Sequence, residues 1–342
     1  MNNGWPCSAL ASASTRDIYF DTSRNAWILS RHADVLEAFR APSLYPVGPR
    51  SKIKPDRLTA DNNERLRMRL ETTSALAPFV LRDWQADIRS FAQQTLDDFV
   101  TGQPVDLVHD YAVPVCLRVA TLATGISSHE AVSLLGLASE ISAAAAEPFD
   151  ESLAARAKDA EAQLRPHFKA GPLALRESGF VALSQTLPRM LANVWLALIQ
   201  RPSAWRRLHF EPALMPRAVE ELLRSAGLTR ILFRMASQSI DLNGTRIQEG
   251  DRLILRLDAA NTDPGHFASP GLLNICRRPV DHFSLGFGRH SCVGAPLIRM
   301  VLVTLTHLLV ERNRQAALYR DVNWQGGSGF LFPNALYVSL RS

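Results

Sequence analysis

The sequence has few cysteines, and none of them belongs to a recognisable metal-binding or disulfide pattern. The 342 residues contain Cys7, Cys116, Cys276 and Cys292, with no CxxC pair and no framework spacing. Isolated cysteines of this kind are typical of free thiols in a reducing compartment. We therefore expect a cytoplasmic protein in which any functional cysteine acts singly.

Long apolar runs and clusters of one charge are also missing. No stretch approaches the ~20 apolar residues of a membrane span. The opening MNNGWPCSALASAS lacks the basic and then apolar order of a secretory signal. The net charge of +5 is spread along the chain without a lysine-rich run, so neither a nucleic acid nor a membrane partner is expected. A basic face for an acidic protein partner stays open.

The composition and the periodicity favour a mainly α protein with a smaller β part. The chain is 46% hydrophobic and 21% charged, as globular domains are. A β-richer part is expected at about 16–45, a helical part at about 62–225, and a β part with a glycine-rich loop at about 228–342. Asn243-Gly244 predicts a hairpin turn. No repeat and no linker divides the chain, so 1–342 is interpreted as one domain.

One cysteine lies in a glycine-rich loop just before a strongly apolar helix. In HFSLGFGRHSCVGAPLIRM, Gly286, Gly288 and Gly294 surround Cys292. Glycines let the backbone approach a flat ligand. N–H groups at the helix start favour an anion, so the pKa of Cys292 should fall. A lone thiolate suits heme iron better than a four-ligand zinc site. A buried structural cysteine in a glycine-rich turn is the alternative that the residues leave open.

The segment FSLGFGRHSCVG resembles the cysteine-ligand loop of bacterial cytochromes P-450, and the similarity extends through GAPLIR. This resemblance implies a cytochrome P-450-like fold with heme b between a distal-face helix and the cysteine loop. Cys292 would then be the axial iron ligand, and Leu285, Gly286, Phe287 and Gly294 would form the sulfur side of the cofactor site. The family usually has phenylalanine where this chain has Leu285, so the apolar shield loses its aromatic character and the redox potential could shift.

A second similar segment is AVEELLRSAG, where Glu221 and Arg224 are three residues apart on an expected helix. This spacing is within salt-bridge reach, and an exposed helix pair is the ordinary alternative. In the family the ExxR pair is buried and braces the heme-binding core. The family's third partner is an arginine, for which Arg277 or Arg278 is the candidate here.

The resemblance also suggests residues for the heme propionates, which call for cationic donors. NNERLRMRL resembles the family's HxxxR helix, with Arg67 kept and Asn63 in place of histidine. FRMASQSIDLNG resembles the strand that supplies another arginine, here Arg234. His290, two residues before the cysteine, completes this set. Each of these residues taken alone would be interpreted as a surface group.

The segment VALSQTLPRMLANVWLAL aligns with the family's distal helix. In that helix an acid and an alcohol relay protons during oxygen activation. Thr186 keeps the alcohol, whereas Gln185 replaces the acid and cannot titrate. A threonine packed in a helix bent by Pro188 is the alternative. By family position, Leu183 and Ile231 are expected to face the substrate.

The chain is short for the family, mainly between 40 and 62 and between 150 and 180, which predicts a smaller or more open pocket. The expected activity is a monooxygenase that oxidises a small organic substrate, of the secondary-metabolite kind, with dioxygen and two electrons. The electrons would come from a ferredoxin or flavodoxin with a separate reductase, because no nicotinamide or flavin motif is evident. Arg289 and Arg299 are candidate contacts for this electron donor.

Two alternatives remain at this point. One is a peroxide-driven or non-hydroxylating biosynthetic heme-thiolate enzyme, for coupling, nitrogen oxidation or rearrangement. The other is a catalytically silent heme-binding or sensing protein.

Overall fold

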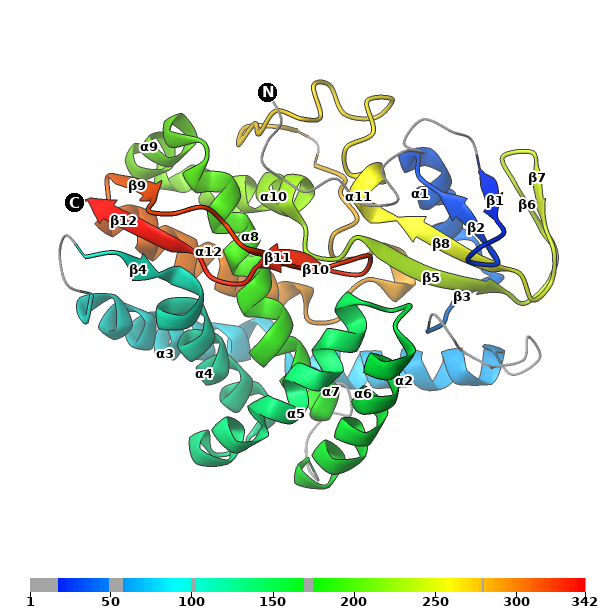
Figure 1. The fold of residues 1–342 in the computed structure, drawn as a ribbon, viewed down its shortest axis with the longest axis horizontal. Helices are drawn as coiled ribbons and strands as arrows, with labels where there is room; N and C mark the ends of the chain where they lie inside the picture. Colours follow the sequence, from blue (N-terminus) through cyan, green and yellow to red (C-terminus); the bar gives the residue numbers. More distant parts are fainter. Residues whose placement is uncertain (1–17, 49–57, 100–102, 169–174, 279, 342) are drawn as a thin grey trace.

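The computed structural model describes residues 18–48, 58–99, 103–168, 175–278 and 280–341. Most helices gather on one side of the molecule, and a twisted sheet lies on the other (Figure 1). Cys7, which is expected to be a free thiol, lies outside the described residues.

Helices account for most of the described chain between 58 and 226, as the periodicity predicts. The α-helices are α1 (His32–Arg40), α2 (Leu58–Ala75), α3 (Pro78–Asp97), α4 (Val113–Thr124), α5 (Ser128–Ala146), α6 (Glu151–Leu164), α7 (Glu177–Val181), α8 (Leu187–Ile199), α9 (Pro202–Phe210), α10 (Met215–Ala226), α11 (Leu257–Ala260) and α12 (Ala295–Arg312). Two π-helical turns, Leu107–Ala112 and Ala182–Thr186, precede α4 and α8, and short 3₁₀ turns occur at Arg165–His167, Pro212–Leu214 and Gly288–His290.

The strands form four small sheets. They are β1 (Tyr19–Asp21), β2 (Ala26–Leu29), β3 (Leu44–Pro46), β4 (Val105–Asp106), β5 (Ile231–Ala236), β6 (Ile240–Leu242), β7 (Thr245–Ile247), β8 (Arg252–Arg256), β9 (Gln315–Leu318), β10 (Trp324–Gly326), β11 (Leu331–Pro333) and β12 (Tyr337–Arg341). The largest sheet has the order β1-β2-β8-β5-β3, and only β2 and β8 pair in parallel. It therefore joins the N-terminal strands to those that follow α10.

The predicted turn at Asn243-Gly244 connects β6 to β7. Both residues have positive φ, 48° and 78°, which a tight two-residue hairpin turn requires. Asparagine and glycine adopt this backbone at low cost, which is why the dipeptide predicts the turn.

The expected helix around Thr186 is interrupted. α7 leads into the π-helical turn Ala182–Thr186, in which the N–H of Leu187 donates to the carbonyl of Ala182. α8 then starts with Pro188 in its first turn. Because proline has no N–H, it cannot donate to the carbonyl four residues earlier, and the wider turn accommodates that loss.

α8 is the central helix of the apolar core. All but two of its residues are buried, including Trp195, whose indole N–H donates to Thr306 in α12 over 3.1 Å. Cys292 lies in the loop that leads into α12, and α12 packs against α3 and α10. The core therefore fixes the helix above the cysteine loop and the helix that follows it.

Among the described residues, no single helix is both long enough and apolar enough to cross a membrane. The segments Leu107–Thr124 and Ser128–Ala146 meet that test only as a joined pair, with a bend of 107° between them.

Candidate functional site

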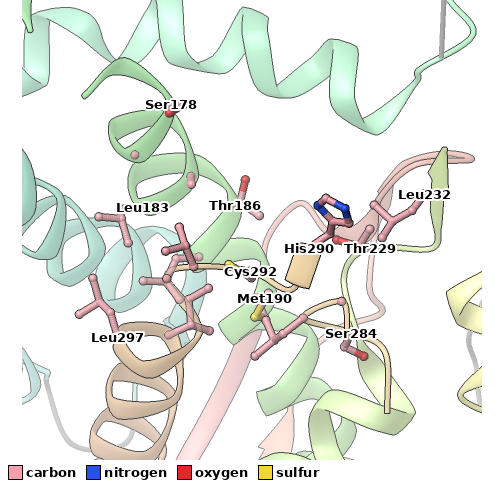
Figure 2. Close-up of a pocket in the computed structure, with 18 of the residues that line it drawn as sticks. Ser178, Leu183, Thr186, Met190, Thr229, Leu232, Ser284, His290, Cys292 and Leu297 are labelled. Atoms are coloured by element: carbon pink, nitrogen blue, oxygen red, sulfur yellow. The ribbon is translucent and has the colours of Figure 1, made fainter. Parts of the chain in front are cut away.

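A cavity of about 320 Å³ lies between the α7–α8 helix and the cysteine loop. Its walls come from three places: the helix between Ser178 and Met190, the chain from Thr229 to Leu257, and the loop from Ser284 to Ile298. The lining is predominantly leucine, isoleucine, valine, methionine and glycine. Figure 2 shows Thr186 above Cys292, with His290 beside them. The fold therefore places the predicted distal helix opposite the predicted cysteine.

The backbone of the loop presents Cys292 at this cavity. Its N–H donates to the carbonyl of Leu285 over 2.7 Å, and the N–H of Ala295 donates to the carbonyl of Cys292 over 3.2 Å. Gly286 has a φ of +71°, and a Cβ there would lie 3.1 Å from the Cα of Ser291. A side chain at this position would strain the turn, so the glycine is required by the loop's shape.

The expected fall in the pKa of Cys292 is wrong. Burial raises the pKa of this thiol above its usual value, although the N–H groups of Gly294 and Ala295 and the cations of Arg69 and Arg299 act in the opposite direction. Loss of hydration outweighs the helix start because the sulfur is enclosed by apolar walls. A thiolate at this position therefore needs a coordinated cation, which deprotonates a thiol outright.

The donor set fits heme. Among the described residues, no group of three or more His, Cys, Asp or Glu side chains is placed to share a metal ion. Cys292 can therefore supply one ligand, which suits a metal that brings its own ring nitrogens. Gly294 adds room on the sulfur side, since a Cβ there would lie 3.8 Å from the Cys292 Sγ. A flat, apolar group with one axial thiolate matches this cradle.

The arginine of α2 that reaches the cysteine loop is Arg69. Its guanidinium donates to the carbonyl oxygen of Ser291 and, over 2.9 Å, to the Ser291 hydroxyl. Arg67 and Asn63, the predicted residues, are both exposed. Two residues correspond to about 200° around a helix, so Arg67 lies on the opposite face from Arg69. The resemblance to the HxxxR helix indicates Arg67 and not Arg69. The alternating arginines of RLRMR place cations on both faces of the helix, which is the signal for Arg69 in the sequence.

Of the other two predicted propionate contacts, one lines the cavity and one is buried in β5. His290 lines it, at the end of the 3₁₀ turn Gly288–His290 (Figure 2). Arg234 is buried in β5, where it donates to the carbonyl of Phe233 over 2.9 Å and lies 5.1 Å from the Phe39 ring centre. Phe287 packs near Phe39 and Arg40 and is not part of the cavity lining.

The distal side contains the predicted alcohol. Thr186 and Leu183 line the cavity, whereas Gln185 does not. Ile231 packs among Ala26, Ile28 and Ile254 on the sheet, and its neighbour Leu232 lines the cavity instead. Successive side chains of a strand point to opposite faces, so the expectation for Ile231 is off by one residue.

Glu221 and Arg224 form a fully buried ion pair. The guanidinium donates to both carboxylate oxygens, over 2.8 and 2.9 Å, and both side chains have zero exposure. Arg277 adds a third bond to Glu221 over 3.0 Å and anchors the carbonyl of Ala268. Of the two candidates for the third partner, Arg277 takes that place and Arg278 is exposed.

A pair of stacked histidines packs behind the loop. The rings of His32 and His266 are 3.5 Å apart and nearly parallel, and His32 also stacks on Phe283, nine residues before Cys292. The Nε2–H of His32 donates to the carbonyl of Asp281 over 2.8 Å, which fixes its neutral tautomer. Burial, followed by the positive charge of His266, lowers the pKa of His32 below 6.5, although Asp263 and Asp281 oppose this.

This stack predicts acid sensitivity. The folded pKa of His32 is below its unfolded value, so the unfolded chain binds more protons and the free energy of unfolding should fall as the pH drops below about 6.5. Urea unfolding at pH about 7.5 and about 5.5 measures that fall. The His32→Gln variant should show a shallower fall than the unmutated protein, and equal slopes would contradict this prediction.

None of the protein-family models matches this chain. Cytochrome P-450 CYP107DY1 of Priestia megaterium is 26% identical, over 80% of this chain and 79% of the relative. Nocardicin C N-oxygenase of Nocardia uniformis subsp. tsuyamanensis is 26% identical, with 92% and 89% covered. Mycinamicin IV hydroxylase/epoxidase of Micromonospora griseorubida is 28% identical, with 84% and 82% covered.

Solved structures have the same fold. P-450 BioI, in complex with an acyl carrier protein ligated to hexadec-9Z-enoic acid, superposes with a TM-score of 0.84 at 22% identity, over 96% of this chain and 95% of that chain. CYP109B1 of Bacillus subtilis gives 0.81 at 21% identity, over 96% and 97%. The fold is therefore the predicted one, with the cysteine loop facing the distal helix. The relatives that span most of both chains are cytochromes P-450, whose cofactor is heme b, and the chain has the cytochrome P-450 fold, so the predicted resemblance to this family is confirmed.

Proposed function

We propose that this protein is a heme-thiolate monooxygenase that oxidises a small, mainly apolar organic molecule. The observation that carries the proposal is the Cys292 thiol at the base of an apolar cavity, with the Thr186 hydroxyl on the opposite wall. When bound, heme supplies the activation of dioxygen and the transfer of one oxygen atom to the substrate. The Cys292 thiolate would donate electron density to the heme iron.

The roles of the chain's own residues are to bind the cofactor and to orient the reacting groups. Cys292 would hold the iron, and the cations of Arg69 and Arg234, with His290, would be available for the propionate carboxylates. Thr186 can donate a hydrogen bond into the cavity. Gln185 can orient water but has no proton to transfer. The apolar walls exclude water from the reacting centre.

The cavity favours an apolar substrate with few polar groups. The hydroxyls of Ser178, Thr186 and Thr229 offer isolated polar contacts. Most of the apolar lining is leucine: Leu175, Leu183, Leu187, Leu232, Leu257, Leu285 and Leu297. Among the described residues, none of the lining comes from α5 or α6, and only residues 147–150 connect these helices. These features support a small pocket. Relatives whose names identify them as acting on mycinamicin IV and nocardicin C favour a secondary metabolite.

We place the electron donor, a ferredoxin or flavodoxin, on the face beside Cys292. Arg289 is exposed there and donates to the carbonyl of Pro42 over 2.8 Å. Arg299 binds Glu220 through two bonds, of 2.7 and 3.0 Å, so part of its charge is already compensated. Among these predicted contacts, Arg289 therefore offers the stronger attraction for an acidic partner.

One observation favours a peroxide-driven enzyme as the second candidate. Among the described lining residues, only His290 and Cys292 are titratable, and no carboxylic acid faces the cavity. Peroxide brings both oxygen atoms and the electrons, so it does not require the acid that the family uses during oxygen activation. Nitrogen oxidation, coupling or rearrangement would use the same site.

The test compares oxidant supplies. The monooxygenase predicts product formation with a ferredoxin–reductase pair and incorporation of labelled oxygen from ¹⁸O₂. Turnover with hydrogen peroxide alone would favour the second candidate. Tight heme and ligand binding without turnover under either supply would identify a silent heme-binding protein.

The Gln185→Glu variant helps to distinguish a dioxygen-dependent enzyme from a peroxide-driven one. Position 185 lies just outside the cavity lining and next to Thr186 in the chain, so the glutamate brings a titratable group to the edge of the site. A positioned general acid is worth about 10²-fold or more. We expect the rate with the reductase pair to rise at least about tenfold while the peroxide-driven rate changes little. Gln185→Asn is the matched control, since it keeps the amide. Equal changes in both rates would contradict the assigned role of this position.

A further inference from the structure

A hairpin from the C-terminal part of the chain holds down the end of α5. The β10–β11 hairpin has the glycine-rich tip Gly327–Phe330 (Figure 1). The N–H of Gly329 donates to the carbonyl of Ala146 over 2.9 Å, and the N–H of Phe330 reaches the same oxygen over 3.4 Å. Backbone thus fastens this tip to the last turn of α5.

The same tip backs the wall of the cavity. Thr229 pairs with Phe330 in an antiparallel bridge, and the N–H of Arg230 donates to the carbonyl of Gly329 over 2.9 Å. Thr229 lines the cavity (Figure 2). The Arg230 guanidinium binds Asp258 over 3.2 Å, next to the lining residue Leu257. The wall at Thr229 is therefore supported by the tip, and the tip is supported by α5.

Two glycines of the tip have no free space, for different reasons. A Cβ at Gly329 would overlap the backbone carbonyl of Ala145, which cannot rotate away. A Cβ at Gly327 would overlap the carboxylate of Glu147, which is the flexible end of a side chain. Only at Gly329 would an added methyl group force backbone apart.

The connection after α5 has a second point of attachment. The Phe149 ring packs edge-on against Phe233 of β5, with centroids 5.8 Å apart, and the Arg24 guanidinium lies 5.5 Å from the Phe149 ring centre. Residues 147–150 are too short to leave slack between the two attachments. Movement of the α5 end therefore requires release of the tip, of Phe149, or of both.

We propose that this junction, formed by the hairpin tip, the α5 end and Thr229–Arg230, limits the size of ligand that the cavity admits. A bulky ligand pressing on Thr229 must move Phe330 and Gly329, and they have no room to retreat because Ala145 and Ala146 lie behind them. Gly329 and Phe149 are then positioning residues, since neither lines the cavity. The inference rests on the proposed heme site and adds the determinant of substrate size.

The test measures two nitrogen ligands of heme iron, imidazole and 4-phenylimidazole, by the Soret shift on the heme-loaded protein. In Gly329→Ala the ratio of the two Kd values should move toward imidazole by roughly tenfold, the scale of one small group in a pocket, because a methyl against the Ala145 carbonyl displaces the tip toward Thr229. Phe149→Ala, which frees the α5 end, should move the ratio toward the bulky ligand and carries the test if Gly329→Ala does not fold. A merely structural role would weaken both ligands together.

The chain offers matched controls. Gly136→Ala lies on α5 with nothing near its Cβ, and Gly327→Ala displaces only the Glu147 side chain, so both should keep the ratio of the unmutated protein. A ratio within about twofold of that value in both Gly329→Ala and Phe149→Ala, or a shift in the same direction in the two variants, overturns the inference. Failure of the unmutated protein to give any Soret shift with imidazole overturns the proposed function, and this inference with it.

Discussion

Replacement of Cys292 by alanine is expected to abolish the thiolate-type Soret band of the reduced, carbon-monoxide-bound protein. Among the described lining residues, Cys292 supplies the one sulfur apart from the thioether of Met190. A thioether cannot ionise, so it cannot supply the anionic electron density of a thiolate. The loss should be complete, because within the described lining no second thiol can take its place.

Cys276→Ala is the matched control for this experiment. Cys276 is a free, half-buried cysteine outside the cavity lining, so its removal should leave the band unchanged. Cys292→Ser separates size from charge: it keeps a small polar side chain but should also lose the band. A normal band in Cys292→Ala would remove the basis of the proposed function.

The cysteine loop shows what local sequence predicts well. Its shape depends on glycines at fixed distances in sequence from Cys292 and on the helix that follows. Both features lie within the segment from His282 to Met300. The turn at Asn243-Gly244 is local in the same sense. Such features were predicted because steric limits on a few neighbouring residues decide them.

Features that depend on distant contacts were predicted less well. Whether Arg67 or Arg69 meets the loop depends on how α2 is rotated against Ser291, more than 200 residues later in the chain. Ile231 and Leu232 exchange roles according to which face of β5 is covered. The pKa of Cys292 depends on burial by walls that come from α8 and β5, and the loop alone cannot reveal it.

The bond from Arg277 to Glu221 shows the same division between local and distant contacts. The three-residue spacing of Glu221 and Arg224 is visible in the sequence, whereas the bond from Arg277 to Glu221 joins residues 56 positions apart. The family's position for this arginine holds no arginine here. A loop conformation, held by bonds from Arg277 to the carbonyls of Ala268 and Leu272, brings the side chain to Glu221.

Glu221→Gln is expected to cause the largest loss of stability of any single change at the ion pairs described above. The carboxylate accepts bonds from Arg224, Arg277 and the N–H of Asn274, and its own side chain is fully buried. The amide cannot compensate two buried guanidinium groups, and breaking a buried pair costs about 3–5 kcal/mol. Because domains have about 5–15 kcal/mol of total stability, heme incorporation should fall sharply.

Glu211→Gln makes the same chemical change at an exposed ion pair and is therefore the control for Glu221→Gln. Glu211 binds Arg207 on the surface of α9, with about half of each side chain exposed, so Glu211→Gln should leave unfolding unchanged. Urea unfolding of both variants, followed by tryptophan fluorescence, gives the comparison. If the two variants had equal stability, Glu221 would not hold the segment from Ala268 to Arg277 against α10. The pair also reaches the start of the cysteine loop, because Arg224 donates to the Asn261 carbonyl and the Asn261 amide donates to the Ser284 hydroxyl. Equal stability would show that this chain of bonds does not hold the loop in place.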